Sequence, residues 1–226
     1  DIKIKNNELF FDVIRKFLKE DKNKTCIEIG CVPGRFLLTF NKLFKYKLSG
    51  IDFADLSGIT RLFNSKGVKN YKLYKKDFLK FDINKKFDVV SSFGFIEHFS
   101  DYEEIFRKHV ALMKKGGTLI LEMPNFNNIQ SEMHKLFDNE NYFRHNRANM
   151  DLKKIEYLCE KYELEILHLN YYKTIDFWID ETDDHLKITK LIFKMLRVVF
   201  KIINFIVDFP NKQTSPYIIL VAKNKK

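Results

Sequence analysis

The stretch that decides the fold is TCIEIGCVPGRF, residues 25–36. Its first five residues are largely apolar and partly β-branched, which predicts a short buried strand. Gly30 and Gly34 then enclose a tight turn, where glycine lets the backbone approach a ligand closely. Pro33 suits the first position of a helix, whose free N–H groups can bind an anion. The turn alone is a weak signal, because Val32 stands where a dinucleotide fingerprint has its middle glycine.

The composition indicates one globular domain over residues 1–226, with 45% hydrophobic and 31% charged residues. Three cysteines at scattered positions form neither a disulfide framework nor a metal-binding pattern, which favours a reducing, cytoplasmic compartment. The net charge of +10 is compatible with nucleic acid, an anionic membrane surface or an anionic substrate, and equally with a lysine-rich composition.

Segments typical of strands and helices alternate along the chain. The predicted strands are residues 25–29, 48–52, 71–75, 87–91, 118–123, 164–170 and 217–222. The predicted helices are residues 7–20, 34–46, 55–65, 101–113 and 151–161. This alternation predicts an α/β fold with a parallel sheet and helices on both faces. Ligands of such sheets bind at the carboxyl ends of the strands. The glycine turn, Asp52, Asp77 and residues 91–93 should therefore line one cleft.

An acidic residue ends the second predicted strand. A carboxylate can accept hydrogen bonds from both hydroxyls of a ribose, and Asp52 lies 18 residues after Gly34, near the spacing expected in a βαβ unit. On this ground alone, an NAD enzyme and a methyltransferase are both open.

Five segments in a fixed order carry a resemblance. They are EIGCVPG (28–34), GIDF (50–53), DF (77–78), FDVVSSFGFIEHF (87–99) and KGGTLILEMPN (115–125). Together they resemble the class I S-adenosylmethionine (SAM)-dependent methyltransferases, and most closely the small-molecule branch that includes the ubiquinone-pathway O-methyltransferases. The resemblance implies a Rossmann-like, mostly parallel seven-stranded sheet in the order 3-2-1-4-5-7-6, with helices on both faces and a helical insertion before the last strand.

The resemblance also implies a site for SAM, whose product is S-adenosyl-L-homocysteine (SAH). The residues that it assigns to the cofactor are Glu28, Gly30, Cys31, Gly34, Asp52, Phe53, Asp77, Phe78, Ser92 and Phe93. Asp52 would bind the ribose, Asp77 the adenine amino group, and the glycine turn the methionine part. Val32 departs from the family pattern, and its Cβ would narrow the approach to the cofactor.

Methyl transfer to oxygen requires the acceptor to lose a proton, so a base near the cleft would help. His98, just after the fourth strand, is the candidate general base. The alternative is a histidine that only packs beside the cofactor. Glu97 adds a second potential ligand, but two ligands do not make a metal site, and no metal ion is predicted.

Residues 125–150 follow the fifth strand, show no clear period and should hang over the cleft as the acceptor-side segment. Tyr142, Arg144 and His145 are the candidate substrate-binding residues, since arginine suits an acceptor that carries phosphate or carboxylate. The alternative is a solvated loop.

An insertion at residues 174–215 contains a patterned stretch, 186–209, in which mostly basic residues recur every three or four positions and nearly all others are apolar. On a helix this gives a narrow basic stripe and a wide apolar face, with too many charges for a comfortable membrane span. The stretch could be buried in this domain or in a homodimer, lie in a membrane interface, or cover an apolar acceptor as a lid together with residues 177–184.

The leading hypothesis is a SAM-dependent methyltransferase that modifies a small or lipid-linked acceptor at oxygen, such as a glycan, a quinone or another anionic metabolite. It would be cytoplasmic or peripheral to the inner face of the membrane. One alternative is an RNA methyltransferase, although SSFG at 91–94 replaces the tetrapeptide that holds an exocyclic amine, and nucleic acid is not the expected partner. Another is a non-catalytic SAM-binding partner subunit.

Overall fold

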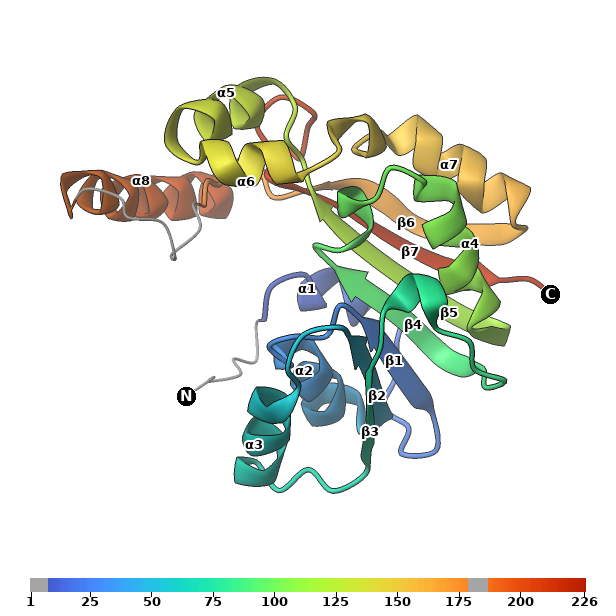
Figure 1. The fold of residues 1–226 in the computed structure, drawn as a ribbon. Coiled ribbons are helices and arrows are strands. Elements are labelled where there is room, and N and C mark those ends of the chain that lie inside the picture. Colours follow the sequence, from blue (N-terminus) through green and yellow to red (C-terminus); the bar gives the residue numbers. More distant parts are fainter. Residues whose placement is uncertain (1–7, 179–186) are drawn as a thin grey trace.

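The computed structural model describes residues 8–178 and 187–226 and contains one seven-stranded sheet (Figure 1). The strands are β1 Thr25–Ile29, β2 Lys47–Asp52, β3 Tyr71–Lys75, β4 Phe87–Phe93, β5 Met113–Pro124, β6 Leu164–Tyr172 and β7 Tyr217–Asn224. Their spatial order is β3-β2-β1-β4-β5-β7-β6, and β7 pairs antiparallel with both neighbours while the other pairs are parallel. The predicted Rossmann-like sheet is confirmed.

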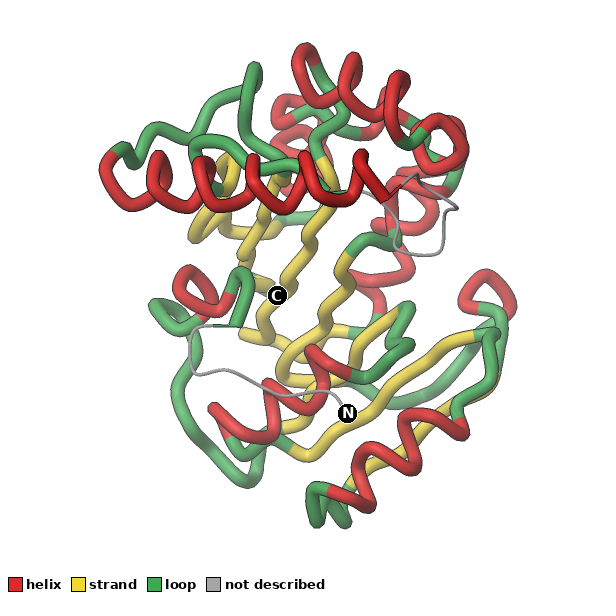
Figure 2. Tube along the Cα trace, turned by 90° about the vertical axis from the view of Figure 1, so that its left-hand side faces the viewer, coloured by secondary structure: helices red, strands yellow, loops and turns green. Residues whose placement is uncertain are grey.

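Helices lie on both faces of this sheet (Figures 1 and 2). The helices are α1 Phe11–Ile14, α2 Arg35–Phe44, α3 Ser57–Ser65, α4 Tyr102–Ala111, α5 Asn128–Phe137, α6 Asn139–Arg144, α7 Leu152–Lys161 and α8 Lys187–Ile206. One apolar core joins the sheet to α1, α2 and α3, and a second joins it to α4 and α7. The helices α5 and α6 lie beyond the carboxyl ends of β4 and β5.

Local signals place several helix starts as predicted. The Asp101 carboxylate accepts the Glu104 N–H at the start of α4, and the Asp151 carboxylate accepts the Lys153 N–H at the start of α7. Such caps each stabilise a helix by about 1 kcal/mol. They set the residue at which each helix begins.

Three predictions about helices are wrong in detail. The described part of residues 7–20 holds only the short α1, because Phe10 adopts φ 70° and packs into an aromatic cluster under the sheet. Pro33 precedes the cap Gly34 instead of opening α2. Residues 125–150, which lack a clear period, form α5 and α6. In each case tertiary packing decides the local structure.

The insertion contains α8, which extends sideways from the rest of the domain in Figure 1. Residues 180–184, predicted as part of a lid, lie outside the described residues. Among residues 8–178 and 187–226, no helix combines the length and the apolar character that crossing a membrane requires.

Candidate functional site

A cavity of about 370 Å³ lies at the carboxyl ends of β1, β2 and β3. It is lined by Gly30, Ile51, Asp52, Phe53, Lys76, Asp77, Phe78, Phe95 and Phe99. Five of the predicted cofactor residues therefore meet in one place. We call this space the cofactor-side cavity.

The Asp52 carboxylate connects β2 to the glycine turn. Its Oδ2 accepts the Val32 N–H at 3.1 Å and its Oδ1 accepts the Ala54 N–H at 3.0 Å. A carboxylate has about four acceptor positions, so both oxygens can still accept bonds from a ligand. Val32 itself lines a separate hollow beside Pro33 and Ile59, so its side chain does not narrow the cofactor-side cavity.

Gly30 has no side chain, and this absence leaves the space in which the cofactor-side cavity forms. Gly30 adopts φ +71°, and a Cβ there would lie 2.5 Å from Cδ2 of Phe95. Gly34 is different, because its Cβ would collide with Ile59 of α3 at 2.9 Å. Gly34 thus allows the packing of α2 on α3, and of the two glycines only Gly30 lines the cofactor-side cavity.

Asp77 and Phe53 remain available to a ligand. Oδ1 of Asp77 accepts the Leu79 N–H at 2.9 Å and caps a single 3₁₀ turn, Phe78–Lys80, which leaves Oδ2 for another donor. Phe53 is 79% exposed at the cavity wall. An aromatic side chain left open beside a cavity offers a face on which a flat ligand can lie.

Other predicted cofactor residues lie behind the turn. Glu28, Cys31 and Ser92 are buried, and none lines the cofactor-side cavity. Burial raises the pKa of the Glu28 carboxyl, although the Leu37 N–H opposes this effect. Ser92 Oγ lies 3.1 Å from Nε2 of His109, whose pKa burial lowers to about 4. These buried side chains do not line the space for a ligand.

A second cavity, of about 470 Å³, opens at the carboxyl ends of β4 and β5. We call it the acceptor-side cavity. Its lining residues are Leu9, Phe10, Phe36, Phe93, Gly94, Glu97, His98, Glu122, Pro124, Asn141, Arg144, His145, Trp178 and Tyr217. It therefore joins the predicted base His98 to Arg144 and His145. Phe93, predicted on the cofactor side, lines this cavity and stacks on Phe36 at 4.1 Å between ring centroids.

Tyr142 does not reach this cavity. It is 2% exposed and its hydroxyl lies 3.3 Å from Ser131 Oγ in α5. The structure thus places Tyr142 in the packing of α6 against α5, and we do not retain it as a substrate-binding residue.

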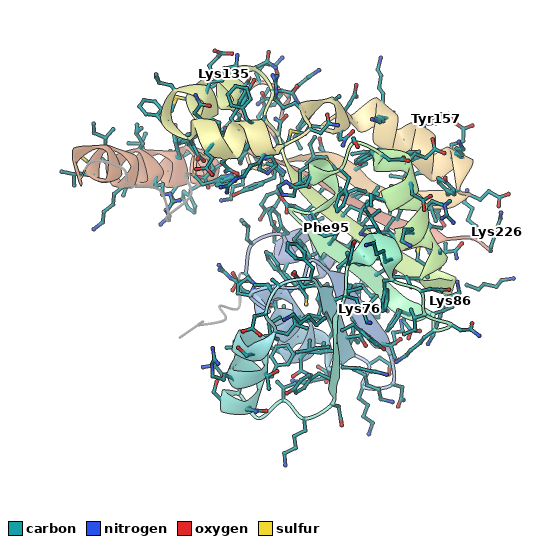
Figure 3. All side chains as sticks on the ribbon, viewed as in Figure 1. Lys76, Lys86, Phe95, Lys135, Tyr157 and Lys226 are labelled. Carbon is teal, nitrogen blue, oxygen red and sulfur yellow. The ribbon has the colours of Figure 1, made fainter. Side chains whose placement is uncertain are left out.

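Phe95 follows the end of β4 (Figure 3) and lines the cofactor-side cavity. Gly94 lines the acceptor-side cavity, while Phe95, the next residue, lines the cofactor-side cavity and touches Gly30. Phe95 and Phe99 were not predicted from the sequence as part of the site. Nor was Glu122, although this acid near the end of a predicted strand carried a positional signal.

A family model described as a methyltransferase domain matches residues 3–169. The chain belongs to this methyltransferase family. No curated protein matches it in sequence.

Solved structures share the fold of this methyltransferase at low identity. The YcgJ protein from Bacillus subtilis is 15% identical with a TM-score of 0.65, over 95% of this chain and 97% of that one. Coclaurine N-methyltransferase, bound to N-methylheliamine and SAH, is 14% identical with a TM-score of 0.63, over 99% and 76%. A SAM-dependent methyltransferase from Archaeoglobus fulgidus is 16% identical with a TM-score of 0.59, over 95% and 91%.

Proposed function

We propose that this methyltransferase transfers a methyl group from SAM to an oxygen atom of a small, lipid-linked acceptor and releases SAH. The two neighbouring cavities support a division of labour between cofactor and acceptor. The observation that carries the lipid-linked assignment is the outward-facing apolar side of α8, described below.

The cofactor-side cavity fits a nucleoside. Gly30 leaves room for the ligand, Asp52 has acceptor capacity for ribose hydroxyls, and Oδ2 of Asp77 can accept from an adenine amino group. When bound, SAM supplies a methyl group on a positively charged sulfur. The contribution of the protein is to align the acceptor with that methyl group.

His98 is placed to accept the proton of the acceptor. Its Nδ1 lies 3.2 Å from the carbonyl oxygen of Arg144. A carbonyl oxygen can only accept, so Nδ1 carries the hydrogen and Nε2 keeps a free lone pair. The side chain is 39% exposed and lines the acceptor-side cavity. The Arg144 guanidinium, paired with Glu140 at the rim, can attract an anionic group of the acceptor.

The helix α8 turns polar side chains towards the domain. Oδ1 of Asn204 accepts the Thr174 N–H at 2.8 Å, and Nδ2 of Asn204 donates to the Ile175 carbonyl. The exposed apolar residues of α8 are Leu191, Ile192, Met195, Val198, Val199, Ile202, Phe205 and Ile206, of which Phe205 is 91% exposed. The burial of this face within the chain, one of the three predicted alternatives, does not occur in the described residues.

The outward face of α8 suits a membrane surface. Large exposed apolar patches mark interaction sites, and exposed Lys194 and Lys201 flank this one with positive charge. A helix that lies in a membrane interface has both features, because its apolar face enters the lipid and its basic residues contact anionic headgroups. A cavity of about 470 Å³ under α8 shares Leu9, Trp178 and Tyr217 with the acceptor-side cavity. A lipid tail held near α8 could therefore keep its headgroup close to His98.

Two measurements test this function. Calorimetric titration should show SAM binding that weakens about 10- to 100-fold in Asp52→Asn, as expected for loss of charged hydrogen bonds, while Asp55→Asn, at a neighbouring exposed acid, binds as the parent does. Labelled SAM should label a lipid extract at oxygen in preference to the water-soluble metabolites. A product labelled at nitrogen would overturn the oxygen assignment, and labelled RNA would favour the RNA methyltransferase.

Flotation tests the membrane contact. The full chain should float with vesicles of phosphatidylglycerol and phosphatidylcholine and much less with phosphatidylcholine alone. A stable dimer that ignores both vesicles would assign the α8 face to a second copy of the chain. A monomer that ignores both would leave the lid as the function of α8.

A further inference from the structure

We propose that Glu97, His98 and His145 bind one divalent transition-metal ion, such as Zn²⁺, in the wall of the acceptor-side cavity. The binding site itself stands on the geometry of these three side chains. The catalytic use of the ion, given below, rests on the proposed methyl transfer to oxygen.

The three donor atoms converge. One ligand atom from each residue lies within 4.8 Å of the other two. Oε1 of Glu97 lies 3.9 Å from Nε2 of His98 and 3.8 Å from Nε2 of His145. Ligand atoms around a tetrahedral Zn²⁺ are separated by roughly 3.4 Å, given metal–ligand bonds of about 2.1 Å. Small side-chain rotations would therefore bring all three onto one ion.

Both histidines present the correct nitrogen. Nδ1 of His145 lies 2.6 Å from the Asn141 carbonyl oxygen, and Nδ1 of His98 lies 3.2 Å from the Arg144 carbonyl oxygen. Each Nδ1 must donate to its carbonyl, so each Nε2 is left with a lone pair near Glu97. A ring N–H bound to a backbone carbonyl is the usual second contact of a metal-binding histidine.

Glu97 supplies an independent indication of a cation site. Its side chain is fully buried, and neither carboxylate oxygen has a hydrogen-bond partner of good geometry among the described residues. Burying a charged carboxylate without a partner costs free energy, and a bound cation would offset that cost by pairing with the charge. Buried Glu122, in the wall of the same cavity, adds a second acid that favours a cation.

The site connects two parts of the chain that are far apart in sequence. Glu97 and His98 belong to a 3₁₀ turn, Ile96–His98, that follows β4, whereas His145 ends α6. The Asn146 N–H already donates to the Glu97 carbonyl oxygen at 2.9 Å. A shared ion would fix the acceptor-side segment against the sheet.

Two histidines and one carboxylate leave a coordination position open, as in catalytic zinc sites. In this protein the open position would face the acceptor-side cavity. A hydroxyl oxygen bound there loses its proton more easily, which is what methyl transfer to oxygen needs. With the ion bound, His98 would be its ligand and not the base, so the proton of the acceptor hydroxyl would pass to water in the open cavity.

The test uses the full chain after removal of metals with a chelator. Titration with Co²⁺, followed by visible absorption, and with Zn²⁺, followed by calorimetry, should show one ion per chain. Glu97→Gln and His145→Gln should each weaken binding by more than about 100-fold, because loss of a ligand exceeds the effect of losing its supporting contact. His168→Gln, a histidine of β6 that lies outside the cluster, is the matched control.

A thermal melt separates the metal site from a purely structural role. Zn²⁺ should raise the melting temperature of the parent chain and of His168→Gln, but not of Glu97→Gln. Absence of Co²⁺ and Zn²⁺ binding, or equal binding by Glu97→Gln, would overturn the metal site. Metal binding without methyl transfer would reject the proposed function and keep the site. Methyl transfer that is unchanged by the chelator and by His145→Gln would reject the catalytic use of the ion.

Discussion

The cofactor-side and acceptor-side cavities are built in different ways. The first is made where β1, β2 and β3 end, by a glycine turn and by acids that directly follow strands. The second combines Leu9, the turn after β4, the end of α6, and Trp178 in the insertion. One cavity depends mainly on residues that directly follow strands, and the other depends on packing between segments outside the sheet.

We expect a single added methyl group to disturb the cofactor-side cavity more than the acceptor-side cavity. Gly30→Ala places a Cβ 2.5 Å from the Phe95 ring and forces alanine into φ +71°. The left-handed conformation alone costs about 1–2 kcal/mol, and the ring must also move into the cavity. We expect SAM affinity to fall by more than about 100-fold, measured by calorimetry.

Gly58→Ala is the matched control for this change. A Cβ at Gly58, within α3, meets no atom within 4 Å, and alanine favours a helix. This variant should bind SAM normally and melt at the same or a slightly higher temperature. If both alanine variants bind SAM alike, the close approach of backbone at Gly30 is not what shapes the cavity.

The difference between the cavities explains what the sequence could predict. The position of Asp52 and Asp77 directly after a strand is visible in the period and the spacing, and both residues line the cofactor-side cavity. The sheet order was predicted from the family resemblance. His145 is separated from Glu97 by 48 residues and reaches it only because α6 folds over β4 and β5. No local pattern contains that information. The same holds for Tyr142, whose hydroxyl lies against Ser131 between α6 and α5, two helices without a clear apolar period in the sequence.

Chemistry on the acceptor side should be separable from cofactor binding. His98→Gln keeps a polar side chain on the cavity wall but lacks the Nε2 lone pair, so it can neither accept a proton nor bind a metal ion as histidine does. We expect turnover to fall by about 100-fold, within the usual range for a positioned base, while SAM affinity changes by less than about twofold. Single-turnover assays and calorimetry on the same samples measure the two effects.

His168→Gln again serves as the control, since it removes a histidine from β6 that lines neither cavity. It should leave both turnover and SAM affinity unchanged. Loss of SAM binding in His98→Gln would contradict the separation of the two cavities and assign His98 to the cofactor.

We expect the smallest effect at α8, which lines neither the cofactor-side cavity nor the acceptor-side cavity. Phe205 is 91% exposed, so Phe205→Ser removes apolar surface that makes few contacts within the chain. Its burial in lipid would contribute about 1.5–3 kcal/mol, so vesicle affinity should fall by roughly tenfold or more, whereas the melting temperature and SAM affinity stay the same. Phe143→Ser, at an exposed phenylalanine of α6, controls for the general effect of the substitution. A Phe205→Ser chain that loses solution stability instead would show that α8 packs within the protein. The acceptor-side cavity would then lack a membrane-facing neighbour.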